Sequence, residues 1–293
     1  MTLPRDLWYN NPMMTNDLTA YRAEAYEFLL GGQIPMSTPA IARRLFGAHR
    51  HEMPETQVVV RALLQADPRF VETHDRCWTV LESPLMQKGL LEATYAVVDL
   101  ETTGSVIGVD EIIEVGVYHV RRGRISRKMG TRVWTDRPIP PWVARLTGIH
   151  NDDIEGAPTF SDIAPKLLKL LDGHVFVAHD IRFDLPFLRW EFARRGLSLP
   201  GVTGLCTLQL SRHLWPELTS RSLADLASHF QIAHANPHRA ADDAGATAGV
   251  LTAALRAARE QGLDHLGQLY SLGSRVDAAS DEEQKLAARS AES

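Results

Sequence analysis

Residues 95–104 constrain this chain more than any other stretch, because they place two acids at the end of a buried strand. The first half of the stretch is apolar and contains two valines, which is typical of a buried β-strand. Asp99 and Glu101 stand at positions i and i+2, so their carboxylates point to the same face of the sheet. Neighbouring carboxylates repel each other and are costly to desolvate. A divalent cation would relieve both costs, whereas a solvated strand end would leave both acids facing water.

Composition narrows the class of protein. The 293 residues suffice for two domains, and 44% hydrophobic and 23% charged residues are usual for a globular protein. No apolar stretch approaches the ~20 residues of a membrane span, and residues 1–16 lack the apolar segment of a secretory signal. The two cysteines, Cys77 and Cys206, are widely separated and favour a reducing cytoplasm over a disulfide scaffold. A net charge of −5 argues against a protein that coats nucleic acid through bulk charge.

The first third of the chain predicts a small domain over residues 16–84. Apolar residues at helical spacing indicate three helices, and two β-prone runs on either side of residues 74–76 indicate a hairpin. Three helices followed by a hairpin resemble a winged helix-turn-helix domain, which would either read DNA or dock a protein. Residues 1–90 carry nine Lys and Arg against ten Asp and Glu, a balance that does not favour phosphate binding. The sequence leaves this choice open.

Residues 93–262 predict a second domain of the α/β class, joined to the first by a linker over residues 85–92. Its expected strands are three in a meander and one further along the chain, at residues 95–100, 111–120, 125–134 and 175–178. Helices between and after these strands predict a mixed central sheet flanked by helices. Residues 263–293 are rich in Ser, Ala and charged residues, and we expect a flexible C-terminal tail there.

Two further acidic sites follow elements that are expected to end at the same sheet edge. Asp184 comes after the strand at 175–178, where the common alternative role is a helix N-cap. His238 and Asp243 lie at the start of a long Ala-rich helix, where acids also interact favourably with the helix dipole. In a regular helix Asp242 would lie nearer to the face of His238 than Asp243 does. Asp243 is therefore the partner only if His238 precedes the helix.

Together and in this order, these residues resemble the DnaQ-like DEDDh family of 3′–5′ exonucleases, which includes the proofreading subunit of bacterial DNA polymerase III. The likeness covers residues 93–262. The matching motifs are Asp99-x-Glu101, Ala178-His179-Asp180-x-x-Phe183-Asp184, His238-x4-Asp243, Glu101-Thr102-Thr103-Gly104 and Leu146-Thr147-Gly148-Ile149. The sequence departs from the family pattern at Asp180, where the family has Asn, and this departure adds a carboxylate near the site.

The resemblance implies an RNase H-like sheet and a site for two metal ions, Mg²⁺ or Mn²⁺. The implied metal ligands are four acids, Asp99, Glu101, Asp184 and Asp243. His238 is the implied general base, which takes a proton from the attacking water. The residues expected near the terminal nucleotide are Thr102, Thr103, Phe183 and His179.

The function that follows is a metal-dependent 3′–5′ exonuclease that hydrolyses single-stranded DNA ends to nucleoside monophosphates, in proofreading or repair. The expected partners are single-stranded 3′ ends and either a DNA polymerase or a repair protein, with no membrane. An exoribonuclease of the same family is the nearest alternative, because these motifs do not reveal contacts to a 2′-hydroxyl. A catalytically silent nucleic-acid-binding or adaptor protein is the alternative from another class. The complete acidic set together with His238 argues against it.

Overall fold

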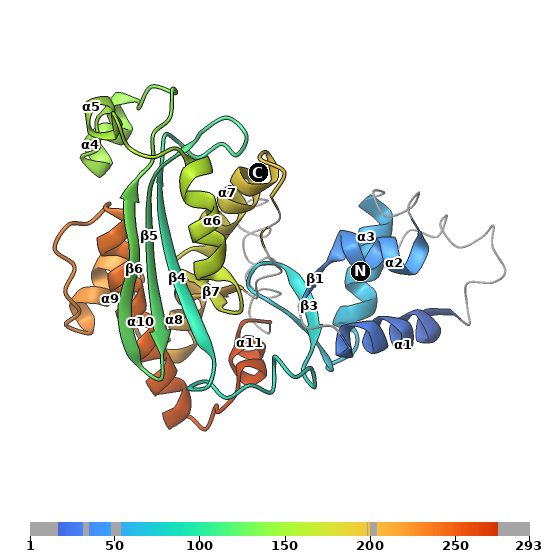
Figure 1. Cartoon of the computed structure of the whole chain (residues 1–293). Helices are drawn as coiled ribbons and strands as arrows, with labels where there is room; N and C mark the ends of the chain where they lie inside the picture. Colours follow the sequence, from blue (N-terminus) through green and yellow to red (C-terminus); the bar gives the residue numbers. More distant parts are fainter. Residues whose placement is uncertain (1–16, 32–34, 48–53, 198, 200–203, 275–293) are drawn as a thin grey trace, which may run out of the picture.

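The computed structural model describes residues 17–31, 35–47, 54–197, 199 and 204–274, and its centre is a five-stranded sheet (Figure 1). The strands are β4 (Thr94–Thr102), β5 (Ile112–Arg121), β6 (Arg124–Arg132), β7 (Val175–Ala178) and β8 (Gly204–Cys206). They lie in the order β6-β5-β4-β7-β8; the β6–β5 and β5–β4 pairs are antiparallel, and the β4–β7 and β7–β8 pairs are parallel. This arrangement confirms the predicted mixed sheet and adds β8, a short strand that the sequence analysis did not predict.

Helices cover both faces of this sheet, as the alternation of strands and helices predicts. Their bounds are α4 (Pro141–Thr147), α5 (Asn151–Ile154), α6 (Phe160–Leu171), α7 (Ile181–Ala193), α8 (Thr207–Leu214), α9 (Leu223–His229), α10 (Ala240–Glu260) and α11 (Leu266–Ser274). Figure 1 shows α6 and α7 on the near face of the sheet, α8 and α10 behind it, and α4 and α5 beyond its upper end. No helix in the described part of the chain is long and apolar enough to cross a membrane.

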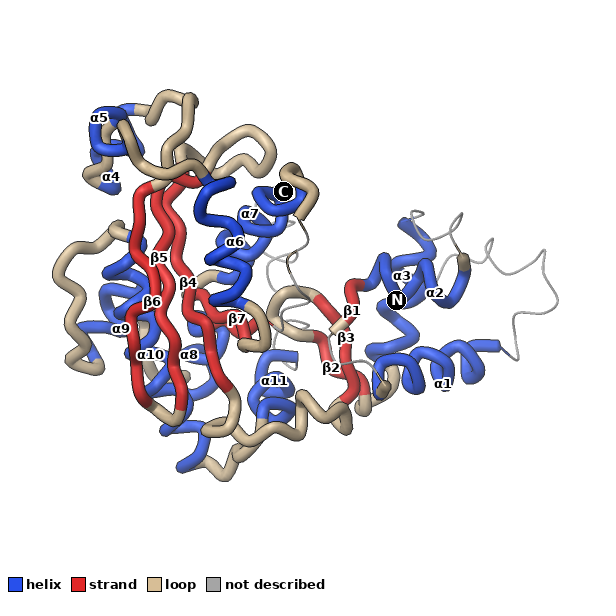
Figure 2. Tube along the Cα trace, in the orientation of Figure 1, coloured by secondary structure: helices blue, strands red, loops and turns tan. Residues whose placement is uncertain are grey.

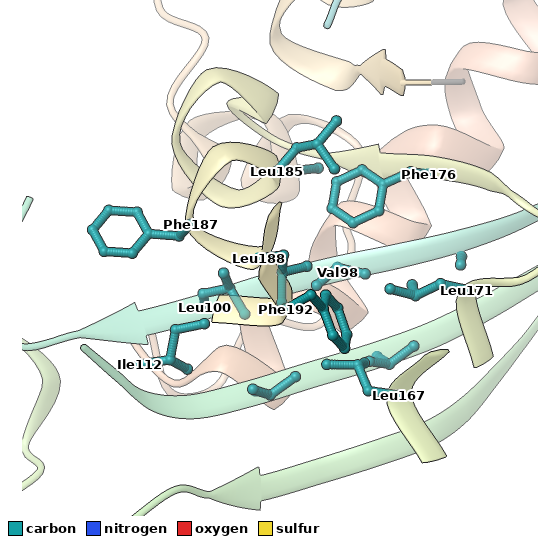
Figure 3. Packing of buried hydrophobic residues seen from close by; sticks show 14 of the residues in the cluster. Val98, Leu100, Ile112, Leu167, Leu171, Phe176, Leu185, Phe187, Leu188 and Phe192 are labelled. Carbon is teal, nitrogen blue, oxygen red and sulfur yellow. The ribbon is translucent and has the colours of Figure 1, made fainter. Parts of the chain in front are cut away.

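Strand β4 is held between two hydrophobic cores, because its side chains alternate in direction. Val98 and Leu100 join residues of α6 and α7, including Phe192, in the cluster that Figure 3 shows. Tyr95 and Val97 pack with residues of α8 and α10 on the other face. Each fully buried large apolar side chain contributes roughly 1.5–3 kcal/mol relative to an exposed one. The strand that carries the two acids is therefore fixed on both faces.

The front part of the chain forms a smaller unit with its own core. Its elements are α1 (Asp17–Leu30), β1 (Met36–Ser37), α2 (Thr38–Phe46), α3 (Pro54–Gln65), β2 (Phe70–Glu72) and β3 (Cys77–Val80), with the strands in the order β1-β3-β2. Trp78 is 2% exposed at the centre of this core, and its indole N–H donates to Thr38 Oγ1 at 3.0 Å. Three helices and the β2–β3 hairpin are present as expected, while β1 was not predicted. The winged-helix assignment itself stays a prediction, and residues 16, 32–34 and 48–53 of its range lie outside the described residues.

The segments on either side of the large domain pack against each other. In the predicted linker, Met86 and Leu90 are buried, and Leu90 N donates to Asp264 O at 2.9 Å. The sequence predicts a flexible tail from residue 263, but residues 266–274 form α11 instead. Leu269 and Tyr270 of this helix are fully buried, because apolar residues recur there at helical spacing. The remainder of the predicted tail, residues 275–293, lies outside the described residues.

The start of α10 lies directly against the sheet. Gly116 of β5 stands opposite Asp99, and a Cβ added to Gly116 would come within 2.0 Å of the carbonyl oxygen of Ala240. Only glycine allows this approach. Glu114 accepts hydrogen bonds from Ala240 N at 2.9 Å and from Arg239 Nη2 at 2.8 Å. These contacts fix the first turn of α10 over the end of β4 that carries the acids.

Replacing Gly116 by alanine should force α10 away from the sheet. We expect Gly116→Ala to lower the free energy of unfolding by about 1–3 kcal/mol, the usual cost of overpacking. Each kcal/mol corresponds to roughly 2–4 °C in the melting temperature of a chain of this size. Gly31→Ala is the matched control, since its Cβ would make an ordinary contact, 3.5 Å from Glu27 O. Equal melting temperatures of the two variants, measured by circular dichroism, would show that the approach is not tight.

Candidate active site

Strand β4 delivers the first two acids to one face of the sheet. Asp99 and Glu101 are both half-buried near its C-terminal end. The pairing of β4 with β5 shifts between Glu101 and Thr102, immediately after the second acid. A shift of this kind locally bends the strand and re-aims its side chains. The predicted Asp-x-Glu pair therefore lies at an irregular strand end, beneath the start of α10.

The first turn of α7 delivers the third acid. Asp184 is 5% exposed, and its Oδ1 accepts a hydrogen bond from Leu100 N at 3.1 Å. This bond attaches Asp184 to the backbone of β4 between Asp99 and Glu101. The alternative role of Asp184 as a helix N-cap is wrong, since the N-cap of α7 is Asp180.

Asp180, the departure from the family pattern, is paired with a neighbouring arginine. Its two carboxylate oxygens accept hydrogen bonds from Arg182 Nε and Nη2, each at 2.9 Å, and Oδ1 also accepts from Arg182 N. Burial alone would raise the pKa of Asp180, but the hydrogen bonds and charge of Arg182 outweigh burial and hold this pKa below its usual value. The extra carboxylate is thus paired with its own arginine.

The residues before and within the first turn of α10 deliver the last acid and a histidine. His238 precedes the helix with a left-handed φ of 63°, and its backbone N–H donates to Asp243 Oδ2 at 3.1 Å. The ligand atoms of Glu101, His238 and Asp243 all lie within 4.8 Å of one another. Asp242 instead accepts a hydrogen bond from Asn236 Nδ2 at 2.6 Å. The structure therefore places Asp243, and not Asp242, beside His238.

Three carboxyl groups of the site, those of Asp99, Glu101 and Asp184, have raised pKa values. Burial, followed by the charge of Asp243, raises the pKa of Glu101 to about 8. Burial, followed by the charge of Asp180, raises the pKa of Asp184 to about 8. Burial and the charge of Asp184 raise the pKa of Asp99 well above its usual value. Carboxyl pKa values rise in this way when burial and the charge of neighbouring carboxylates make ionisation unfavourable.

This donor set fits a divalent cation. The ligand atoms of Glu101, His238 and Asp243, two carboxylates and one imidazole nitrogen, lie within 4.8 Å of one another, and the carboxyl groups of Asp99 and Asp184 interact with them electrostatically. Oxygen-rich sets suit hard divalent cations, and a cation would relieve the repulsion that raises the carboxyl pKa values. The five residues predicted to carry the chemistry are thus brought together, and their individual roles stay predictions.

Three of the residues predicted to contact a nucleotide are placed beside the acids or in the first turn of α7. The Thr102 hydroxyl donates to the Gly104 carbonyl oxygen, and the Thr103 hydroxyl donates to Asp110 Oδ1 at 3.1 Å. These bonds hold the loop after β4. Phe183 is half-buried and packs against the ring of Phe187 at a centroid distance of 5.0 Å. Contact of these residues with a substrate stays a prediction.

The fourth such residue, His179, is bonded within the protein. Its Nε2 donates to the carbonyl oxygen of Arg221 at 3.1 Å, so its Nδ1 is the atom that accepts from Thr207 Oγ1 at 3.0 Å. Burial lowers the pKa of His179. The ring is therefore neutral and fixed between the end of β7 and the start of α8.

The sequence analysis missed three residues that support Asp243. Glu114 and Arg239 fix the start of α10 through the hydrogen bonds described above. His234 Nε2 donates to Asp243 Oδ1 at 2.5 Å, and the His234 side chain is 8% exposed. Groups that hydrogen-bond a metal ligand fix its orientation. No motif indicated these residues, because their partners lie on a different element or across a loop.

The sequence model of the exonuclease family matches residues 96–251, more than half of the chain, and this range contains the four acids and His238. The chain belongs to the exonuclease family. This match confirms the resemblance to DnaQ-like 3′–5′ exonucleases that the motifs indicated. It leaves the front unit, residues 17–80, outside the matched range.

Two relatives that match this chain are much longer proteins. The 3′-5′ exonuclease DinG of Staphylococcus saprophyticus is 39% identical over 178 residues, which are 61% of this chain and 20% of that protein. A PolC-type DNA polymerase III of Caldanaerobacter subterraneus is 30% identical over 249 residues, which are 82% of this chain and 18% of that protein. The chain thus spans about a fifth of the length of these relatives.

A solved exonuclease shares the fold. The crystal structure of E. coli exonuclease I in complex with a dT13 oligonucleotide has a TM-score of 0.53 to this chain. The match covers 58% of this chain and 42% of that one at 18% sequence identity. The central sheet described above is therefore the RNase H-like sheet that the motifs implied.

The raised carboxyl pKa values predict how pH acts on the metal-free exonuclease. Glu101 and Asp184 have ordinary values of 4.5 and 3.8 and titrate near 8 when folded. Between these limits the folded protein binds more protons than the unfolded chain, so stability falls as pH rises. We expect the melting temperature in EDTA to fall between about pH 5 and pH 8, and Mn²⁺ to raise it more at pH 8 than at pH 6.

Glu101→Gln is the control for this titration, because the amide cannot ionise. The pH dependence of its melting temperature should be shallower than that of the wild-type protein. Identical slopes for the two proteins would contradict the shifted pKa of Glu101.

Removing His234 should loosen Asp243 without removing a metal ligand. We expect His234→Ala to weaken Mn²⁺ binding by about 10- to 100-fold, the usual effect of losing a group that orients a ligand. His229→Ala, which changes an exposed histidine of α9, is the control and should bind Mn²⁺ like the wild-type protein. Titration calorimetry measures both, and equal affinities for the two variants would exclude this role of His234.

Proposed function

We propose that this chain is a 3′–5′ exonuclease that uses Mg²⁺ or Mn²⁺ to release nucleoside monophosphates from single-stranded DNA ends. The observation that carries this proposal is the convergence of Glu101, His238 and Asp243 within 4.8 Å, beside Asp99 and Asp184. The name and 39% identity of the DinG relative support the direction of cleavage, and the DNA bound to exonuclease I supports the choice of substrate.

In this mechanism the four acids would hold two metal ions at the end of β4. Such ions would lower the pKa of the attacking water and neutralise charge on the leaving 3′ oxygen. Asp99 and Glu101 approach from the sheet, Asp184 from α7 and Asp243 from α10. His234, with Glu114 and Arg239, keeps Asp243 in place.

His238 is the general base in this proposal because its environment differs from those of the neighbouring histidines. His179 and His234 use their rings in internal hydrogen bonds. The His238 side chain is exposed, and its ring nitrogen lies within 4.8 Å of the oxygens of Glu101 and Asp243. A neutral imidazole nitrogen can accept a proton from an attacking water. The proton of the attacking water therefore passes to His238.

Proofreading and repair stay open as the setting of this activity. A PolC-type DNA polymerase III among the relatives supports a link to replication, and the relative named 3′-5′ exonuclease DinG supports the same activity in a protein that is not named as a polymerase. RNA is the alternative substrate, and the test below distinguishes the two nucleic acids.

The test is a time course on single-stranded DNA and matching RNA, labelled at either end, with Mg²⁺, Mn²⁺ or EDTA. We expect stepwise shortening from the 3′ end of DNA that EDTA abolishes. His238→Ala should lower kcat by about 10²- to 10⁴-fold, the usual contribution of a general base. His229→Ala should match the wild-type protein. Metal-loaded protein that cleaves neither strand would overturn the proposal, and faster cleavage of RNA would reassign the substrate.

A further inference from the structure

The front unit completes an edge of the exonuclease sheet. Among the described residues, strand β8 pairs with a strand on one side only, that of β7, so the N–H groups on its other side need partners. Gly204 N donates to Asp75 Oδ1 at 3.3 Å, and Cys206 N donates to His74 Nδ1 at 2.8 Å. His74 and Asp75 lie in the turn between β2 and β3. Two side chains of the hairpin thus take the place of a neighbouring strand.

His74 is committed to this role. Because Cys206 N donates to Nδ1, that nitrogen carries no proton and the ring is neutral. Burial is the main cause that lowers the pKa of His74 to about 3. The other ring nitrogen, Nε2, is buried and has no hydrogen-bond partner among the described residues. A buried polar atom without a hydrogen bond costs free energy. The position of His74 therefore satisfies Cys206 N through Nδ1 at the cost of leaving Nε2 without a partner among the described residues.

Asp75 joins the hairpin to α7 as well as to β8. Its side chain is 2% exposed, and its Oδ2 forms an ion pair with Arg189 Nη2 at 2.9 Å. Thr73 Oγ1 also donates to Asp75 Oδ1, so the carboxylate accepts from three different residues. A Cβ on Gly204 would lie 2.8 Å from the Asp75 Cβ, so only glycine allows this approach.

The contact of Asp75 with Arg189 and the contact of His74 with Cys206 each connect the hairpin to an element that carries residues of the candidate active site. Arg189 lies on α7 five residues after Asp184, about 7.5 Å along the helix axis. Cys206 Sγ donates to His179 O at 3.2 Å, and the next residue, Thr207, holds the His179 ring. Figure 2 shows the small sheet of the front unit between helices α1–α3 and the large domain.

We propose that His74 and Asp75 are positioning residues of the exonuclease site, through β8 and α7. This inference rests on the proposed function for its kinetic part only. The β2–β3 hairpin holds α7, which carries Asp184. It also holds β8, which directly precedes Thr207, the residue bonded to the His179 ring. A displacement of about 1 Å at a catalytic group can lower a rate by about 10²-fold. The β2–β3 hairpin therefore acts on the reaction through its contacts with α7 and β8.

The experiment measures kcat, KM and Mn²⁺ affinity in the full chain. We expect Asp75→Ala and His74→Ala to lower kcat by about 10- to 100-fold and to weaken Mn²⁺ binding by about 10-fold, because Asp184 loses its fixed place. His74→Asn should restore most of the loss, since its amide oxygen can accept from Cys206 N in place of Nδ1. Arg76→Ala changes an exposed neighbour in the same turn and is the control.

Melting curves of each variant show whether it is folded at the assay temperature. If the alanine variants do not fold, Asp75→Asn and Arg189→Ala, which break only the ion pair, decide the question by the same measurements. Folded variants with wild-type kcat and Mn²⁺ affinity would overturn the proposal and leave the hairpin as a docking contact. If the wild-type protein has no nuclease activity, the proposed function fails, and Mn²⁺ affinity alone still tests the positioning role.

Discussion

The carboxylates of Asp99, Glu101, Asp184 and Asp243 repel one another, and the fold holds them together against that repulsion. Three separate elements bring them to the end of β4, and each is tied to the sheet by a specific contact. The Leu100 amide binds Asp184, and other bonds from β5 fix the start of α10. A metal site of this kind needs a rigid frame, because ligands free to move apart would lose the geometry that a cation requires.

Sequence reasoning found what local spacing determines. The two-residue period of a strand predicted that Asp99 and Glu101 share a face, and the left-handed residue before α10 explains why Asp243 rather than Asp242 faces His238. It could not find contacts between distant elements. His234 lies nine residues before its partner across a loop, and no periodicity connects the two. Gly116, opposite Asp99, was missed for the same reason, because only the close approach of α10 requires glycine at this position.

The segments at the two ends of the large domain also show contacts that sequence reasoning did not predict. Residues 263–274 were expected to be a tail, because the composition of the whole C-terminal segment is polar. The apolar residues at its start form a helix that packs against Met86 and Leu90, which stand in the expected linker. A composition averaged over 31 residues concealed a short amphipathic stretch. The front unit and the exonuclease domain thus share a hydrophobic core, in which Val71 of the hairpin takes part.

Strand β8 has a consequence for how this protein behaves in solution. An open sheet edge is a template for strands of other molecules, and His74 and Asp75 occupy the donors that such a strand would seek. A fragment cut at the limits of the family match, residues 96–251, would keep the four acids and His238 and lose this cover. The N–H groups of Gly204 and Cys206 would then be open to a strand of another molecule, which the hairpin side chains exclude in the full chain.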